Sequence, residues 1–118
     1  MSRLMVHLSE IAHGRSGDKG NHANVAVIAY SPAGYAWLRE NLSSERVRSY
    51  FAPMGVRRVE RYEASNVQAV NFVLYDVLDG GASLSPRSDS QGKSLALALL
   101  RMHIDLYPEE LQAMRRRP

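Results

Sequence analysis

The stretch Asn24-Val25-Ala26-Val27-Ile28-Ala29-Tyr30 decides the fold, because it is apolar and rich in β-branched residues from its second residue onward. Such a run predicts a central strand that is buried on both faces. A similar run, Ala69-Val70-Asn71-Phe72-Val73-Leu74-Tyr75, predicts a second strand. The amide of Asn71 must find hydrogen-bond partners if it is buried there. We therefore expect Asn71 to hold a neighbouring loop against the sheet, or to orient a ligand.

A polar, glycine-rich segment comes directly before the central strand and reads His13-Gly14-Arg15-Ser16-Gly17-Asp18-Lys19-Gly20-Asn21-His22-Ala23-Asn24. Glycines permit tight turns, so we predict a loop that exposes its backbone N–H groups. Successive N–H groups form a concave anion site, which Arg15 and Lys19 would complete. A purely structural loop, in which Asp18 pairs with one of these cations, is the alternative. The candidate ligand-binding residues are Arg15, Ser16, Gly17, Asp18, Lys19, Gly20, Asn21, Asn24, Asn71 and Lys93.

Two helices with apolar stripes at helical spacing follow the central strand. Ser31 supplies a hydroxyl cap for the first helix, and Pro32 suits its first position. Ser43 or Ser44 caps the second helix, which ends near residues 53–55. The residues predicted to face inward are Tyr35, Leu38, Leu42, Val47, Tyr50, Phe51 and Met54.

The remaining segments are less regular. Residues 3–8 alternate loosely and predict a short strand. Residues 56–63 are charged and partly alternating, which predicts a strand with one wet face near an edge. The serine- and glycine-rich segment 79–92 predicts a long loop. A helix and a strand both fit residues 93–106, because leucines there recur at helical spacing and also alternate; residues 102–106 predict a last short strand.

In chain order these elements form an α+β fold, the ferredoxin-like β-α-β-β-α-β layout with an extra N-terminal strand. Helices would cover one face of a mostly antiparallel sheet. The apolar strands imply that the other face is covered too, by self-association or by a partner. A length of 118 residues suits one domain, 1–118, with a basic tail at about 115–118.

Composition narrows the possible functions. The chain has no cysteine, which excludes disulfides and thiolate chemistry and fits a reducing cytoplasm. It has no secretory segment and no run of transmembrane length, so we expect a cytoplasmic protein with no membrane contact. The net charge of +3 equals the charge of the arginines in the tail, Arg115, Arg116 and Arg117, and the rest is near neutral. We therefore expect no nucleic-acid partner.

Motifs for catalysis are weak. The histidines, His7, His13, His22 and His103, lack the spacing of a helical metal pair, so we expect no metal and no cofactor. The residue types of a hydrolytic triad occur near Ser16, but the strand–turn–helix setting of a nucleophile elbow is missing. No catalytic residue is predicted, and Lys93 is a second candidate contact for an anion.

The segment Arg15-Ser16-Gly17-Asp18-Lys19-Gly20-Asn21, followed by Ala23-Asn24-Val25, resembles the opening signature of the ferredoxin-like domain of acyclic terpene utilisation proteins, the AtuA family. Later blocks at residues 47–51, 71–74 and 89–95 agree with it. The resemblance spans the chain from about Ile11 to Met102.

This resemblance implies a metabolic setting for the protein and does not specify a reaction. In the family the domain commonly follows a much larger N-terminal domain, and it also occurs as a separate short protein. We therefore expect a stand-alone accessory subunit that assembles with itself and with a larger AtuA-like protein. The family's link to breakdown of acyclic terpenoids and branched acyl chains implies an acyl-CoA or another anionic small molecule as ligand. The alternative is a direct enzyme component that acts through Arg15, Asp18, Lys19 and Asn21.

Overall fold

The computed structural model describes residues 2–19, 22–75 and 95–116. Its strands are β1 (Leu4–His7), β2 (Ala12–Lys19), β3 (His22–Ala29), β4 (Val59–Ala64), β5 (Ala69–Leu74) and β6 (His103–Leu106). Its helices are α1 (Pro32–Asn41), α2 (Ser44–Phe51) and α5 (Pro108–Met114), with single 3₁₀ turns at Leu8–Glu10, Ala52–Met54 and Ser65–Val67. Residues 95–100 are also helical. Of the helix and the strand that both fitted residues 93–106, the helix is therefore correct at the start of the described part.

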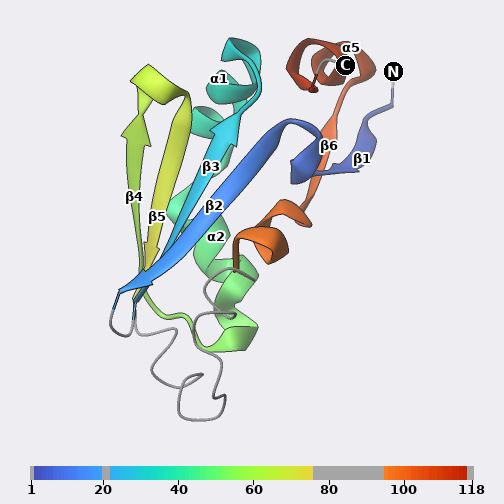
Figure 1. Cartoon of the computed structure of the whole chain (residues 1–118). Helices are drawn as coiled ribbons and strands as arrows, with labels where there is room; N and C mark the ends of the chain where they lie inside the picture. The colour runs from blue at the N-terminus through green and yellow to red at the C-terminus, as the bar shows by residue number, and fades with distance from the viewer. Residues whose placement is uncertain (1, 20–21, 76–94, 117–118) are drawn as a thin grey trace.

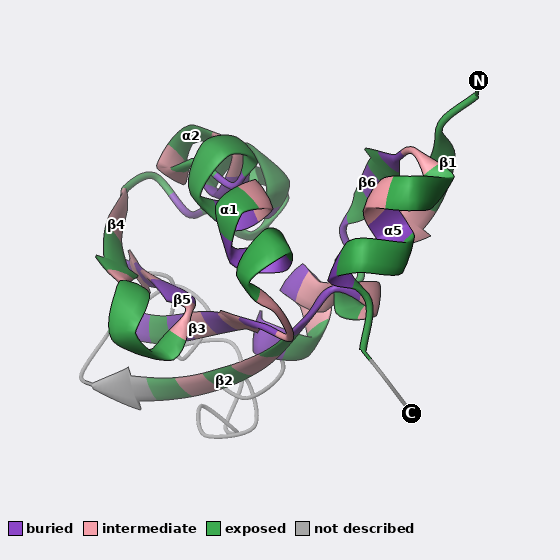
Figure 2. Cartoon of the chain, turned by 90° about the horizontal axis from the view of Figure 1, so that it is seen from above, coloured by how far each residue is buried: buried purple, intermediate pink, exposed green. Residues whose placement is uncertain are grey.

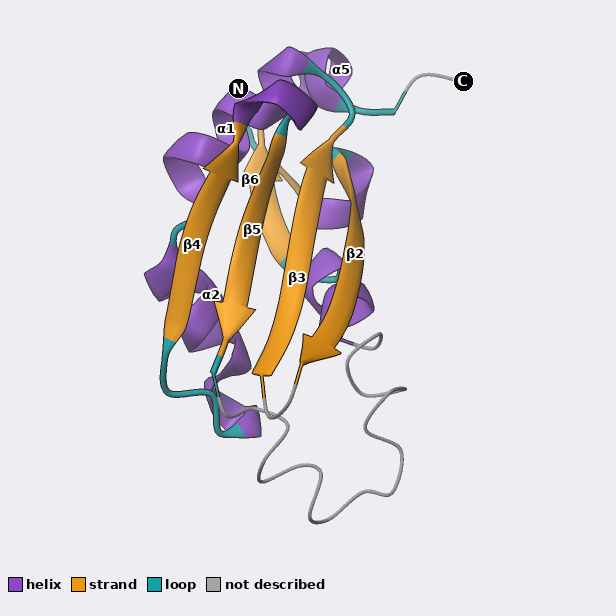
Figure 3. Ribbon diagram, turned by 60° about the vertical axis from the view of Figure 1, so that its left-hand side comes forward, coloured by secondary structure: helices purple, strands orange, loops and turns teal. Residues whose placement is uncertain are grey.

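The strands form two sheets in which every described pair is antiparallel (Figures 1 and 3). The larger sheet has the order β2-β3-β5-β4, and β1 pairs with β6 in a separate two-stranded sheet. The segment from β3 through α1 and α2 to β4 and β5 is a split β-α-β unit, which confirms the ferredoxin-like α+β class. The N-terminal addition is larger than predicted, because both β1 and β2 precede this unit.

Helices cover only one face of the larger sheet, as Figures 2 and 3 show. Along β3, buried residues therefore alternate with half-exposed ones, and Val25 and Val27 are buried while Ala26 and Ile28 are not. Within a single chain this strand is buried on one face only, since no described helix lies against its second face, and burial of both faces depends on a partner. Large side chains that are fully buried between sheet and helices include Leu38, Leu42, Phe51, Phe72, Leu74, Leu95 and Leu99.

Both predicted helix caps are confirmed. The Ser31 hydroxyl accepts a hydrogen bond of 3.0 Å from the N–H of Gly34, and Pro32 occupies the first turn of α1. The Ser43 hydroxyl accepts an equivalent bond of 3.0 Å from the N–H of Arg46 in α2. Five of the residues predicted to face inward are buried: Tyr35, Leu38, Leu42, Val47 and Phe51.

The other two predicted core residues are exposed. Tyr50 is 37% exposed, and Met54 is 46% exposed. Tyr50 lies beside the buried stripe of α2 and donates a hydrogen bond of 2.6 Å from its hydroxyl to the carbonyl of Ala98. Met54 lies beyond α2, because the helix ends at Phe51 and a 3₁₀ turn follows. The helical spacing therefore does not extend to Met54.

Candidate functional site: the signature strand and the open face

The glycine-rich signature is mainly a strand, so the prediction of a loop was wrong for most of it. Residues Ala12–Lys19 pair in unbroken antiparallel register with His22–Ala29. The neighbouring β3 supplies backbone hydrogen-bond partners, which makes a strand possible despite the weak strand propensity of these residues. Gly14 is required for packing, because a Cβ there would lie 3.3 Å from the carbonyl oxygen of Ala26 and 3.4 Å from Cδ1 of Leu100.

Side-chain alternation divides the signature between the two faces of the sheet. Gly14 approaches the helical residues 95–100, so Ser16, two positions along the strand, lies on that same side. Arg15 and Gly17 lie on the opposite side, which no described helix covers. We call this side the open face. Its residues include His13, Arg15, Gly17, Asn24, Ala26, Ile28, Glu60, Tyr62, Asn71 and Val73.

The strand register brings four candidate residues together on the open face. One row across the sheet runs Arg15, Ala26, Asn71, Tyr62, and the next runs Gly17, Asn24, Val73, Glu60. The Arg15 and Asn24 side chains are exposed, and Asn71 is half-buried. Ser16 is separated from this group by the sheet.

Asn71 does not make the contact predicted for it. Its side chain forms no hydrogen bond with another residue in the described part of the chain. Because Asn71 is half-buried on the open face, water can hydrate the amide, and no loop contact is needed. Arg15 likewise has no hydrogen-bond or ion-pair partner among the described residues.

Several candidates stay predictions. Gly20, Asn21 and Lys93 lie outside the described residues, as does the segment 79–92 that was predicted to be a long loop. The backbones of Asp18 and Lys19 pair with Ala23 and His22, and their side chains are not described.

A cluster around Glu60 lies on the open face, and sequence reasoning missed it. The Glu60 carboxylate accepts hydrogen bonds of 2.6 Å from the hydroxyls of Tyr62 and Tyr75 and from the guanidinium of Arg58. The Arg58 guanidinium also lies 4.3 Å from the centre of the Tyr75 ring, and the His22 ring packs against that ring at 4.6 Å. The cluster therefore borders the end of β3 where the signature hairpin turns.

These contacts fix the protonation states of the cluster. Hydrogen bonds from Tyr62, Tyr75 and Arg58 lower the pKa of Glu60 from 4.5 to about 2. Hydrogen bonding to Glu60 raises the pKa of both Tyr62 and Tyr75 above 10. At neutral pH the carboxylate is thus ionised and the hydroxyls are neutral donors, so the hydrogen bonds of the cluster hold its side chains in place.

A titration of Glu60 tests this arrangement. Because the folded-state pKa lies below the unfolded value, the cluster stabilises the fold fully above about pH 4.5, and that contribution is lost as the pH falls towards 2. Replacing both Tyr62 and Tyr75 with phenylalanine is expected to raise the pKa of Glu60 towards 4.5, as measured by NMR of the carboxyl carbon. Tyr50→Phe removes a hydroxyl far from Glu60 and should leave its pKa near 2. An unchanged pKa in the double variant would contradict the assignment.

The described residues offer no metal site, and the grooves that they line do not contain the candidate residues of the open face. Within ranges 2–19, 22–75 and 95–116, no group of three His, Asp or Glu side chains could hold a metal ion. A groove of about 560 Å³ is lined by Ser9, Leu97 and Arg101, among others, and contains no candidate residue. No described helix is long and apolar enough to cross a bilayer.

An antiparallel sheet that carries its described helices on one face defines this protein as a ferredoxin-like α+β domain. The family model for the AtuA ferredoxin-like domain matches residues 6–105, and the chain belongs to this family. The resemblance carried by the signature is thus confirmed. No curated protein and no solved structure matches the chain significantly.

Proposed function

We propose that this protein is an accessory subunit that works with a larger AtuA-like protein in the cytoplasmic breakdown of acyclic terpenoids and branched acyl-CoA thioesters. The observation that carries the proposal is the family match, which covers residues 6–105 of 118. The chemistry of the open face supports a binding role, because the Arg15 and Asn24 side chains are exposed there and the Glu60 carboxylate is already held by three donors.

Co-purification tests the subunit role directly. The tagged chain is expressed together with a larger AtuA-like protein from the same cell, and the complex is weighed by light scattering. Recovery of both proteins in a fixed ratio is the expected result. Recovery of the small chain alone, at every protein concentration tested, would overturn the proposal.

The signature strand also supports anion binding. The Arg15 guanidinium is exposed and has no partner among the described residues, so its donors are available. The Asn24 side chain is exposed on the adjacent strand, in the next row of the open face. Charge-assisted hydrogen bonds from arginine suit a phosphate or a carboxylate, which are the anionic groups of an acyl-CoA.

Arg15→Gln is expected to weaken the binding of coenzyme A about tenfold, because it removes a charge-assisted contact worth about 1.5 kcal/mol. Isothermal titration calorimetry measures the change. Arg101→Gln is a matched control, since Arg101 is exposed but lies outside the open face. An equal loss in both variants would point to unspecific attraction, and no loss in Arg15→Gln would remove Arg15 from the site.

The second candidate function is a direct enzyme component that uses the same signature. Lys19→Ala separates the two functions. Loss of turnover by the complex, with assembly intact, is expected if the signature takes part in the chemistry. Loss of assembly or of stability is expected if its role is structural.

A further inference from the structure

The open face is large enough to be an interface. The four strands lie about 4.8 Å apart, and their paired residues extend about 20 Å along each strand. Together these two dimensions give a flat footprint of about 400 Å². Accessible surface exceeds a flat footprint, so the face reaches the size of the smaller interfaces, below the roughly 800 Å² that each partner buries in a standard one. Its two middle strands carry the half-buried side chains of Ala26, Ile28 and Val73 beside the amides of Asn24 and Asn71, and the Tyr62 residue at one edge is 52% exposed.

We propose that the open face packs against the open face of a second copy of this chain, about a two-fold axis that runs parallel to the strands. The proposal deepens the assembly role proposed above by naming the surface and its occupant. Aligned packing of two sheets face to face is a common way to bury such surfaces. A two-fold interface must be self-complementary, and this requirement can be checked row by row.

The direction of the axis follows from charge. An axis parallel to the strands places β2 of each copy over β4 of the other. An axis across the strands would place β2 over β2, and it would bring His13 and Arg15 close to the same residues of the second copy. Two arginines facing each other repel, whereas β4 offers the Glu60 carboxylate and the Tyr62 ring. The parallel axis is therefore favoured.

With this axis, larger side chains of one copy face smaller ones of the other. Each row of the sheet is reversed in the second copy, so the residue at the β2 end meets the residue at the β4 end, and β3 meets β5. The facing pairs of unequal size are His13 with Ala64, Ile28 with Ala69, Ala26 with Asn71, and Gly17 with Glu60. Such alternation lets two sheets interdigitate at native packing density.

Besides Asn24 with Val73, the remaining facing pair is formed by Arg15 and Tyr62. They stand at opposite ends of one row, so the contact occurs twice in the dimer. The Tyr62 ring is exposed, and the hydrogen bond from its hydroxyl to Glu60 holds it in place. A guanidinium stacks well on such a ring and keeps its in-plane N–H groups free.

The same two-fold axis brings a second arginine of the interface towards Arg15, the residue proposed to bind an anion. Within one copy, Arg15 and Arg58 lie at opposite edges of the sheet. In the dimer, Arg58 of the second copy lies along the same edge as Arg15, two rows or about 14 Å further along the strands and on the facing sheet about 10 Å away, so the two backbones are about 17 Å apart. Two long side chains can span this distance to one phosphate. The second copy would then complete the anion site at the rim.

A charge exchange tests the dimer. Sedimentation equilibrium is run on the whole chain without ligand or larger partner, for the wild type, Arg15→Glu, Tyr62→Arg and the double variant. The wild type is expected to be a dimer. Each single variant is expected to weaken dimerisation at least tenfold. In Tyr62→Arg the new cation faces Arg15, and in Arg15→Glu the stacking cation is lost and the new carboxylate lies one row from Glu60 of the second copy. The double variant is expected to regain the dimer, because opposite charges then meet twice. Circular dichroism verifies that each variant is folded.

Arg101→Glu is the matched control, because it makes the same charge change outside the open face and should keep the dimer. A wild type that is monomeric at about 10⁻⁴ M would overturn the proposal. So would a dimer that neither single variant weakens, or a double variant that stays monomeric. The dimer is measured without an anion and without the larger protein. Its outcome therefore does not affect the tests of the subunit role and of coenzyme A binding.

Discussion

Phe72→Ala is expected to lower the free energy of unfolding by about 3–5 kcal/mol, the largest effect of any single change considered for this protein. Phe72 is fully buried on β5, on the side of the sheet that faces the helices. Truncation removes the ring from the centre of the core, and close-packed neighbours can fill the space only in part. Urea denaturation, followed by circular dichroism, measures the loss.

Val73→Ala is the matched control, because Val73 is the next residue of the same strand and lies half-buried on the open face. Its truncation is expected to cost less than about 1.5 kcal/mol, since a half-exposed side chain loses less burial and leaves no closed cavity. Equal losses in the two variants would mean that both faces of β5 are buried in solution. In that case the measurement should be repeated on a monomeric variant such as Arg15→Glu, in which the two costs are expected to separate.

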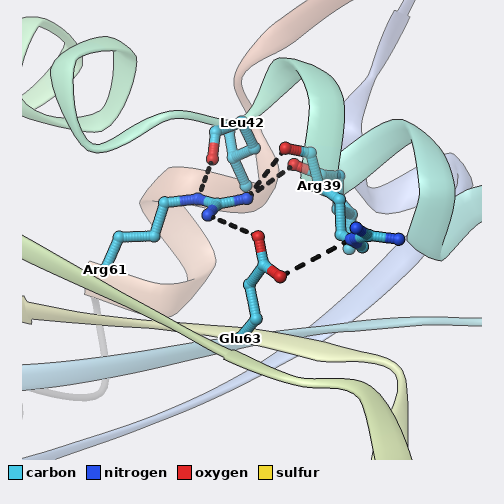
Figure 4. Close-up of polar contacts among 5 residues, drawn as sticks. Arg39, Leu42, Arg61 and Glu63 are labelled. Carbon is cyan, nitrogen blue, oxygen red and sulfur yellow. Dashed lines mark hydrogen bonds and ion pairs between the residues drawn. The ribbon is translucent and has the colours of Figure 1, made fainter.

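Arg61→Met is expected to lower the free energy of unfolding by about 2–3 kcal/mol. Arg61 reaches from β4 to the C-terminal end of α1, and its side chain is only 19% exposed. Its guanidinium donates hydrogen bonds of 2.9 Å to the carbonyls of Leu42 and Arg39, and it pairs with Glu63 at 2.8 Å (Figure 4). These carbonyls are at a helix end, where backbone acceptors lack partners within the helix and a positive charge is favourable.

Methionine keeps most of the apolar stem of Arg61 but removes every donor, so the carbonyls of α1 would have to find water. Arg48→Met is the control: Arg48 also pairs with a glutamate, Glu45, but its side chain is 44% exposed and the pair lies on the surface of α2. Exposed pairs contribute less than about 1 kcal/mol, so the control should change little. A loss in Arg61→Met no greater than in Arg48→Met would show that Arg61 does not link β4 to α1.

Local patterns in the sequence were sufficient to predict most of the helices and strands. The apolar runs that became β3 and β5 form strands because their β-branched residues suit a pleated backbone. The caps at Ser31 and Ser43 act over a few residues, so their outcome did not depend on distant contacts. Amphipathic spacing failed at Met54, where α2 ended sooner than the pattern did, and at Tyr50, which lies beside the buried stripe of α2.

The candidate site could be predicted in part. Arg15, Gly17, Asn24 and Asn71 lie on one face, as expected of a shared site, whereas Ser16 lies on the other because strand alternation divides neighbours. The Glu60 cluster gave no signal, since its members are unremarkable in sequence and come together only through the pairing of β4 with β5. Family membership, by contrast, was evident from the signature and is confirmed over residues 6–105.

The sequence by itself determined most of the strands and helices, where α1 and α2 begin, and to which family the chain belongs. The tertiary structure decided that the signature is an edge strand and that β1 pairs with β6 apart from the larger sheet. It also decided which face of that sheet stays open. The physical reason is range: propensity and capping act between near neighbours, whereas strand pairing and helix packing join residues far apart in the chain.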